Sequence, residues 1–163
     1  LPPLYGVKRM KLLVLSDIHG RWAAMMRAVQ DHPDAAAVFF LGDGIRDAEE
    51  LQDRRLGIPL YLVRGNCDLG SYAPTEGLVP LGGALIFYTH GHLYNVKSGL
   101  GPLARQAKGA GADIALFGHT HRPLHEEWDG VHLFNPGALG SAAGSYGVVI
   151  LGEGPARFQW DYV

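Results

Sequence analysis

Five apolar runs of the chain each lead into side chains that can bind a metal ion. The run at 11–16 is followed by Asp17 and His19, and the run at 38–42 by Asp43. The three later runs lead into amide, thiol, carboxylate and imidazole groups: Asn66, Cys67, Asp68, His90, His92, His119 and His121. Carboxylate and imidazole ligands mixed with an amide suit first-row divalent metals, whereas an all-oxygen set suits Mg or Ca.

The number of these groups indicates two metal ions. Seven ligands drawn from these side chains would exceed what one ion with an open position takes, but they would suffice for two ions that share a bridging carboxylate. Two divalent cations also outweigh the two negative charges of Asp17 and Asp43, so the centre attracts phosphate and lowers the pKa of bound water. Each motif alone has an ordinary reading as a turn, a helix cap or a pair of strand residues. Their joint occurrence after five apolar runs favours the metal centre.

The elements that must position these groups follow from apolar patterns and turn residues. Strands are expected at 11–16, 38–41, 60–64 and 114–117, with helices at 21–32, 46–56 and 102–108. A hairpin at 78–81 and 84–89 is expected to have its first strand at a sheet edge, because Pro80 cannot donate a ladder hydrogen bond. Strands at 124–128, 131–134, 146–151 and 156–162 suit an antiparallel sheet. The expected class is α/β, with two packed sheets and helices outside.

Composition bounds the remaining possibilities. The chain has 163 residues, 47% hydrophobic and 18% charged, which suits one folded domain over 10–163. Residues 1–9 are expected to be an N-terminal extension or a cloning remnant. No apolar run reaches the ~20 residues of a membrane span. A single cysteine excludes an internal disulfide, and no secretory signal is visible, so the cytoplasm is the expected compartment. The net charge of −2 and scattered basic residues make stable nucleic-acid binding unexpected.

Six short motifs together resemble those of a known superfamily. They are DIHG at 17–20, GDG at 42–44, GNCD at 65–68, THGH at 89–92, GHTH at 118–121 and the weaker NPG at 135–137. In this order they resemble the calcineurin-like metallophosphoesterases, and within them the small YfcE-type bacterial and archaeal phosphodiesterases. The resemblance implies a four-layer α/β/β/α sandwich with a two-metal site at its rim.

The resemblance also implies which residues hold each ion. Asp17, His19 and His121 would bind one ion, and Asp43 would bridge to the second. Asn66, His90 and His119 would bind that second ion, and Asn66 would also contact the substrate phosphate. Manganese is the first expectation for both ions, with Fe, Ni, Co and Zn as alternatives.

The catalytic acid is where this sequence departs from its relatives. Many family members carry a histidine after the asparagine, thought to protonate the leaving group, whereas this chain has Cys67. A thiol with an ordinary pKa of ~8.5 is a poor acid, so either the substrate has a good leaving group or His92 acts instead. Asp68 is expected to orient a ligand imidazole or to form a turn. Arg64 is a candidate phosphate contact, with a structural hydrogen bond as the alternative.

These features predict a metal-dependent phosphodiesterase that cleaves small phosphodiesters or nucleotides by attack of a metal-bridging hydroxide. The predicted catalytic residues are Asn66, Asp68 and His92, and the predicted substrate contacts are Asn66, Cys67 and Arg64. The alternative is an interaction scaffold resembling the metallophosphoesterase-like subunit of the retromer sorting complex. The complete ligand set favours the enzyme. The short chain leaves little room for a substrate cap, so the site is expected to be accessible to solvent. Homo-oligomerisation is a further possibility.

Overall fold

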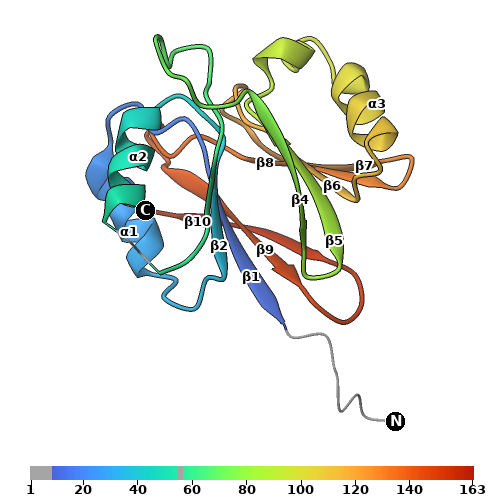
Figure 1. Cartoon of the computed structure of the whole chain (residues 1–163), viewed down its shortest axis with the longest axis horizontal. Coiled ribbons are helices and arrows are strands. Elements are labelled where there is room, and N and C mark those ends of the chain that lie inside the picture. Colours follow the sequence, from blue (N-terminus) through green and yellow to red (C-terminus); the bar gives the residue numbers. More distant parts are fainter. Residues whose placement is uncertain (1–8, 55–56) are drawn as a thin grey trace.

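The computed structural model describes residues 9–54 and 57–163, and within these ranges the strands form two sheets of five (Figure 1). In spatial order, sheet A comprises β10 (Arg157–Tyr162), β9 (Ser145–Leu151), β1 (Met10–Leu15), β2 (Ala37–Phe40) and β3 (Leu60–Leu62). Sheet B comprises β4 (Glu76–Leu81), β5 (Ala84–Thr89), β6 (Ile114–Leu116), β8 (Val131–Pro136) and β7 (Pro123–Trp128).

Helical crossovers give each sheet its parallel part. Helix α1 (Trp22–Gln30) joins β1 to β2, and α2 (Ile45–Asp53) joins β2 to β3, so these three strands run parallel. In sheet B, α3 (Gly101–Gly109) lies between β5 and the parallel strand β6. Helices α1 and α2 lie on one side of the paired sheets and α3 on the other (Figure 1).

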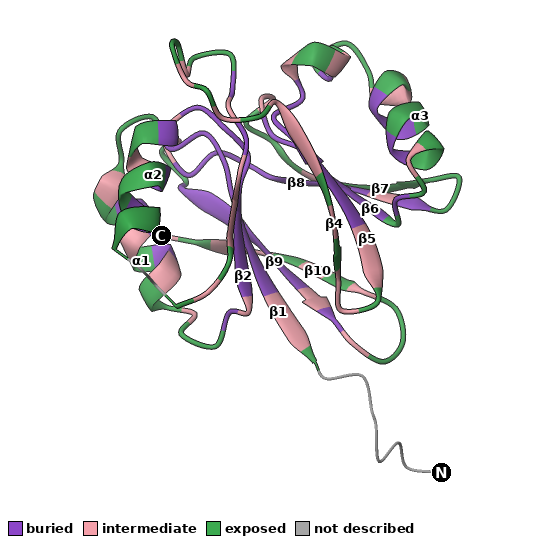
Figure 2. Cartoon of the chain, viewed as in Figure 1, coloured by how far each residue is buried: buried purple, intermediate pink, exposed green. Residues whose placement is uncertain are grey.

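The two sheets pack face to face, and helices cover their outer faces. Alternate residues of β1 point to opposite sides, so Leu12 and Val14 lie in the core between the sheets, while Leu13 and Leu15 pack under the helices. On the far side, Leu103 of α3 packs on the outer face of sheet B. Burial on both faces explains why the central strands read as unbroken apolar runs (Figure 2). The predicted four-layer α/β/β/α sandwich is confirmed.

Most predicted elements are confirmed, with ends shifted by one to three residues. Pro80 lies in β4, an edge strand as expected. The predicted helix over 46–56 ends at Asp53, and positions 55–56 lie outside the described residues. The predicted strand over 60–64 ends at Leu62. The expectation for residues 1–9 falls outside the described residues except at Arg9. Within the described residues, no helix is both long and apolar enough for a membrane span.

The prediction that the four C-terminal strands suit one antiparallel sheet is wrong. Strands β7 and β8 form a hairpin that extends sheet B, where β8 runs parallel to β6. Strands β9 and β10 form a second hairpin that extends sheet A, where β9 is antiparallel to β1. Strands β8 and β9 are almost wholly buried, and each lies inside its sheet with a strand on either side.

Candidate metal centre

The ends of five strands bring the predicted ligands to one edge of the sandwich. Loops after β1, β2, β3, β5 and β6 carry them, and the carboxyl ends of parallel strands converge at one edge. The seven side chains form a continuous set of contacts: Asp17, His19, Asp43, Asn66, His90, His119 and His121.

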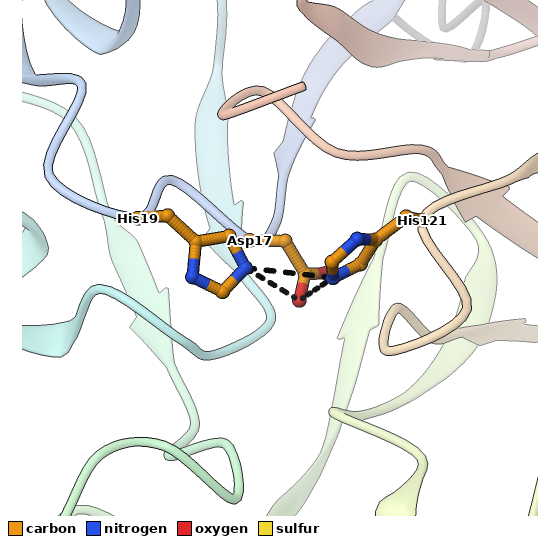
Figure 3. A group of neighbouring side chains, drawn as sticks. All are labelled: Asp17, His19 and His121. Carbon is orange, nitrogen blue, oxygen red and sulfur yellow. Dashed lines mark hydrogen bonds and ion pairs between the residues drawn. The ribbon is translucent and has the colours of Figure 1, made fainter.

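The first group consists of Asp17, His19 and His121 (Figure 3). The Oδ1 atom of Asp17 lies 3.1 Å from Nε2 of His121 and 3.7 Å from Nε2 of His19. The two imidazole Nε2 atoms are 3.4 Å apart. Asp17 is fully buried, while both histidines are partly exposed, so one side of this group is open to a ligand.

The second group centres on His90, which is fully buried. Its Nε2 lies 3.4 Å from Oδ2 of Asp43, 3.0 Å from Oδ1 of Asn66 and 3.2 Å from Nδ1 of His119. Donor atoms of Asp17, Asp43 and His90 also lie within 4.8 Å of one another. Asp17 therefore belongs to both groups, and the bridging role expected for Asp43 stays a prediction.

The hydrogen bonding of His90 shows that this cluster suits a cation. Its Nδ1 donates to the carbonyl oxygen of Leu41 at 2.7 Å, because a carbonyl can only accept. In a neutral imidazole, Nε2 then carries a lone pair, and it faces the acceptor oxygens of Asn66 and Asp43. Lone pairs that converge in this way are satisfied by a positive charge between them. The residues present thus fit a bound divalent metal.

Ionisation of the Asp43 carboxylate agrees with this fit, while His90 would have to be deprotonated at Nε2 to bind a metal. Burial raises the pKa of Asp43, but the hydrogen bond and charge of His90 and the amide of Cys67 outweigh it and hold that pKa well below its usual range. Burial lowers the pKa of His90, while Asp43 and Asp17 act against it, and the net shift is upward. The carboxylate is therefore charged at neutral pH, as a metal ligand must be.

The ligand loops have an unusual backbone. Five of the seven predicted ligands have positive φ angles between 48° and 71°: Asp17, His19, Asp43, His119 and His121. Residues with a side chain seldom adopt this left-handed conformation, and it costs on the order of 1–2 kcal/mol at each position. Such strain gathers at functional sites, where the surrounding structure holds it in place.

Gly118 allows two of these loops to meet. A Cβ atom at this position would overlap the Ser16 hydroxyl and lie 2.9 Å from Oδ2 of Asp17. The same Oδ2 accepts hydrogen bonds from the Ser16 hydroxyl at 2.6 Å and from the His119 amide at 3.2 Å. Ser16 is a site residue that the sequence interpretation missed, since a serine at the end of an apolar run carries no signal of its own.

Asp68 binds backbone amides, so the expectation that it orients a ligand imidazole is wrong. Its carboxylate accepts four hydrogen bonds of 2.7–3.0 Å, from the amides of Asp43, Gly44, Ile45 and Gly65. The bond to Gly65 is the turn-type contact considered as the alternative. The bonds to Gly44 and Ile45 cap the beginning of α2. Asp68 thereby fixes the loop that carries Asp43, and a direct catalytic role for it stays a prediction.

The other predicted contacts differ in their surroundings. Arg64 donates to the carbonyls of Ser71 and Ala73, each at 3.2 Å, which is the structural role named as its alternative. The ring of His92 lies 5.4 Å from that of His90, and its buried Nδ1 has no hydrogen-bond partner among the described residues. Cys67 is exposed beside Asn66, and partial desolvation of its thiol, together with the charge of Asp43, raises the thiol pKa above its ordinary value.

Asn135, in the weaker NPG motif, supports the loop after β6. Its Nδ2 donates to the carbonyl of Gly118 at 3.2 Å and to the hydroxyl of Thr120 at 3.0 Å. Its Oδ1 accepts from the amide of Gly137. The motif therefore holds the GHTH segment in position from an adjacent strand.

A four-layer sandwich whose strand ends gather carboxylate, imidazole and amide groups at one edge defines the metallophosphoesterase class. The family described as "Calcineurin-like phosphoesterase superfamily domain" matches residues 10–153, and the chain belongs to this family.

Individual relatives agree with this assignment. The chain is 32% identical over 132 residues to "Probable metallophosphoesterase YsnB" of Bacillus subtilis, which covers 80% of this chain and 75% of that protein. It is 31% identical over 170 residues to "Phosphodiesterase YfcE" of Escherichia coli K12, covering 86% and 87%. A predicted phosphoesterase from Streptococcus pneumoniae superposes with a TM-score of 0.82 at 25% identity, covering 95% and 90%.

A relative of another kind also matches. "Vacuolar protein sorting-associated protein 29" of Schizosaccharomyces pombe is 41% identical over 83 residues, which is 51% of this chain and 44% of that protein. The chain is therefore similar to a protein whose name refers to sorting as well as to proteins named as phosphoesterases.

Proposed function

We propose that this chain is a phosphodiesterase that uses two divalent transition-metal ions to hydrolyse small phosphodiesters or nucleotides. The observation that carries the proposal is the pair of adjoining donor groups that share Asp17 at the edge of the sandwich. Resemblance to YfcE, named as a phosphodiesterase, supports the reaction class.

The donor groups divide into two metal sites. Asp17, His19 and His121 would hold one ion, and Asn66, His90 and His119 the other, with Asp43 between them. The ions, when bound, would supply positive charge for the phosphate and would lower the pKa of water so that it can act as the nucleophile. Manganese is our first candidate for both sites.

The remaining side chains would act directly on the substrate. The Asn66 amide can donate to a phosphate oxygen, where developing negative charge is stabilised. The exposed Cys67 borders the same space. His92 is the imidazole beside the donor cluster that is not in the ligand set, and it is our candidate for protonating the leaving oxygen.

Two grooves beside the cluster favour a diester over a monoester. One has a volume of about 460 Å³ and is lined by His19, Asp43, Cys67 and Leu69 among others. The other, of about 670 Å³, begins at Thr120 within the GHTH segment. A diester has two arms and a monoester one, so two separate grooves, one lined by candidate ligands and one beginning at Thr120, suit the diester. Should Cys67 rather than His92 face the leaving oxygen, its weak acidity would favour esters with good leaving groups.

Hydrolysis of bis(p-nitrophenyl) phosphate, compared with p-nitrophenyl phosphate, tests the proposal. Protein loaded with Mn²⁺ should cleave the diester faster, should lose activity with a chelator, and should contain about two ions per chain by elemental analysis. Asp43→Asn should reduce kcat/KM by at least about 100-fold, whereas Asp34→Asn, an exposed carboxylate paired with Lys11, should not. Equal activity in both variants would refute the proposal.

The alternative is an interaction scaffold, and an exposed apolar loop beside the centre favours it. Leu69 is 87% exposed and Tyr72 is fully exposed, which suits a protein-contact surface. Similarity to the sorting protein points the same way. Absence of bound metal after incubation with Mn²⁺, Zn²⁺ and Ni²⁺, together with absence of hydrolysis, would select the scaffold over the enzyme.

A further inference from the structure

The larger groove begins at Thr120, which lies between two candidate ligands in the chain, and follows strand β7. Arg122, Leu124 and Trp128 form one side of it, since alternate residues along a strand point to the same face. The segment 96–100, which precedes α3, forms the opposite side. At ~3.3 Å per residue, the distance from Arg122 to Trp128 along the strand is about 20 Å, longer than a single aromatic ring.

Thr120 connects this groove to the centre. It lies between His119 and His121 in the chain and lines the near end of the groove. Its hydroxyl accepts hydrogen bonds from Asn135 and from the amide of Arg122. Asn135, which holds the GHTH segment in position, therefore also fixes this end of the groove. Thr120 and Arg122, which flank His121 in the chain, therefore mark the end of the groove that lies nearest to the candidate ligands.

The near end of the groove is positively charged. Lys97 and Arg122 both line it, and neither forms an ion pair with any residue that the structure describes. One carboxylate, Glu126, lies farther along the groove and accepts a hydrogen bond from the Trp128 indole at 2.9 Å.

The far end of the groove is apolar. Leu100 and Leu124 face it, and Trp128, which is 39% exposed, closes it. An indole held by its N–H offers a fixed flat surface for an aromatic ring. The groove thus combines two unpaired cations near the centre with an aromatic surface farther away.

We propose that this groove binds one arm of the substrate diester, an arm that carries a second anionic group and an aromatic or apolar part, as a phosphorylated nucleoside does. Lys97 and Arg122 hold the anionic group by charge-assisted hydrogen bonds, and Leu124 and Trp128 contact the ring. The proposal rests on the proposed function, because it names the class of substrate for the same centre.

Two chromogenic diesters that differ by one phosphate test it. Thymidine 5′-(p-nitrophenyl phosphate) and its 3′-phosphorylated derivative release the same p-nitrophenolate. They differ only in the thymidine arm that remains on the phosphate. The Mn²⁺-loaded wild type should show a higher kcat/KM for the 3′-phosphorylated ester. The double variant Lys97→Ala with Arg122→Ala should lose about 10-fold to 100-fold of that preference, mainly through KM. Lys97→Arg with Arg122→Lys should retain most of it.

A control pair removes the same charge elsewhere. Arg27→Ala with Arg157→Ala changes two exposed cations, on α1 and β10, and should leave the preference unchanged. Trp128→Ala should raise KM for both thymidine esters but not for bis(p-nitrophenyl) phosphate. An equal kcat/KM for the two thymidine esters, or an unchanged preference in the Lys97/Arg122 variant, would overturn the groove assignment and leave the phosphodiesterase proposal standing.

A binding measurement keeps the groove testable if no diester is cleaved. Thymidine 3′,5′-bisphosphate should bind the wild type more tightly than the Lys97/Arg122 double alanine variant in calorimetric titrations with Mn²⁺ present. Equal affinity would refute the groove, whatever the hydrolysis assays show. Failure of all hydrolysis with a clear difference in binding would instead refute the proposed reaction.

Discussion

Replacing Asp68 tests whether a network of backbone hydrogen bonds holds the metal centre together. Asp68→Asn keeps the size of the side chain but leaves one acceptor oxygen where the carboxylate has two. The new amide group would face backbone N–H groups that also donate. About half of the four charge-assisted hydrogen bonds would be lost, including part of the cap of α2. At about 1–2 kcal/mol for each loss, the free energy of unfolding should fall by about 2–4 kcal/mol.

Thermal denaturation followed by circular dichroism measures this loss, and the expected decrease in Tm is about 5–15 °C. Mn²⁺ affinity, measured at a temperature where both proteins are folded, should weaken by about 10-fold to 100-fold, because the loop that carries Asp43 is no longer fixed. Asp34→Asn makes the same chemical change at an exposed site and should leave both quantities nearly unchanged. If Asp68→Asn melted and bound Mn²⁺ like the wild type, the positioning role assigned to this carboxylate would be wrong.

Three further predictions, the first two with a control variant, probe other parts of the molecule. Cys67→His should raise kcat for diesters with poor leaving groups at least about tenfold relative to bis(p-nitrophenyl) phosphate, and Cys67→Ser should not, since only imidazole is an effective acid near neutral pH. Gly118→Ala should lower the free energy of unfolding by more than about 2 kcal/mol and prevent Mn²⁺ binding, because its methyl group would overlap the loop after β1. Gly109→Ala, at an open position in α3, should instead add up to about 1 kcal/mol in urea denaturation. Burial, and then the charge of Asp161, raise the pKa of Tyr146 to about 12. The unfolded chain ionises this tyrosine first, so about 3 kcal/mol of stability, complete below pH 10, should be lost between pH 10 and 12, and Tyr146→Phe should lack this loss.

The convergence of the candidate ligands at one edge could be predicted from the sequence because each follows an apolar run. Strand order is not needed for that inference, since parallel strands direct their carboxyl ends to the same edge whatever their neighbours are. Asp17 and His90, which belong to different sheets, are therefore brought together as expected. The layer arrangement is predictable for a related reason, because strands that are apolar on both faces require cover on both sides.

Partners chosen only in three dimensions could not be predicted. Asp68 accepts from amides of another loop, and its sequence context does not distinguish that role from contact with an imidazole. The two C-terminal hairpins have similar local turn signals, yet one extends sheet B and the other extends sheet A. Local patterns specify that two strands pair, but the sheet they join depends on which core surface is left uncovered.

The left-handed backbone at five candidate ligand positions sets the proposed metal binding against the stability of the fold. Glycine relieves the strain at such a position, so exchanging a ligand for glycine removes a metal donor and at the same time relaxes the loop. A lineage released from the need to bind metal would therefore lose its ligands without weakening its fold. The same sandwich can then persist as a surface for other proteins, which agrees with the similarity of this chain both to proteins named as phosphoesterases and to one named for vacuolar sorting.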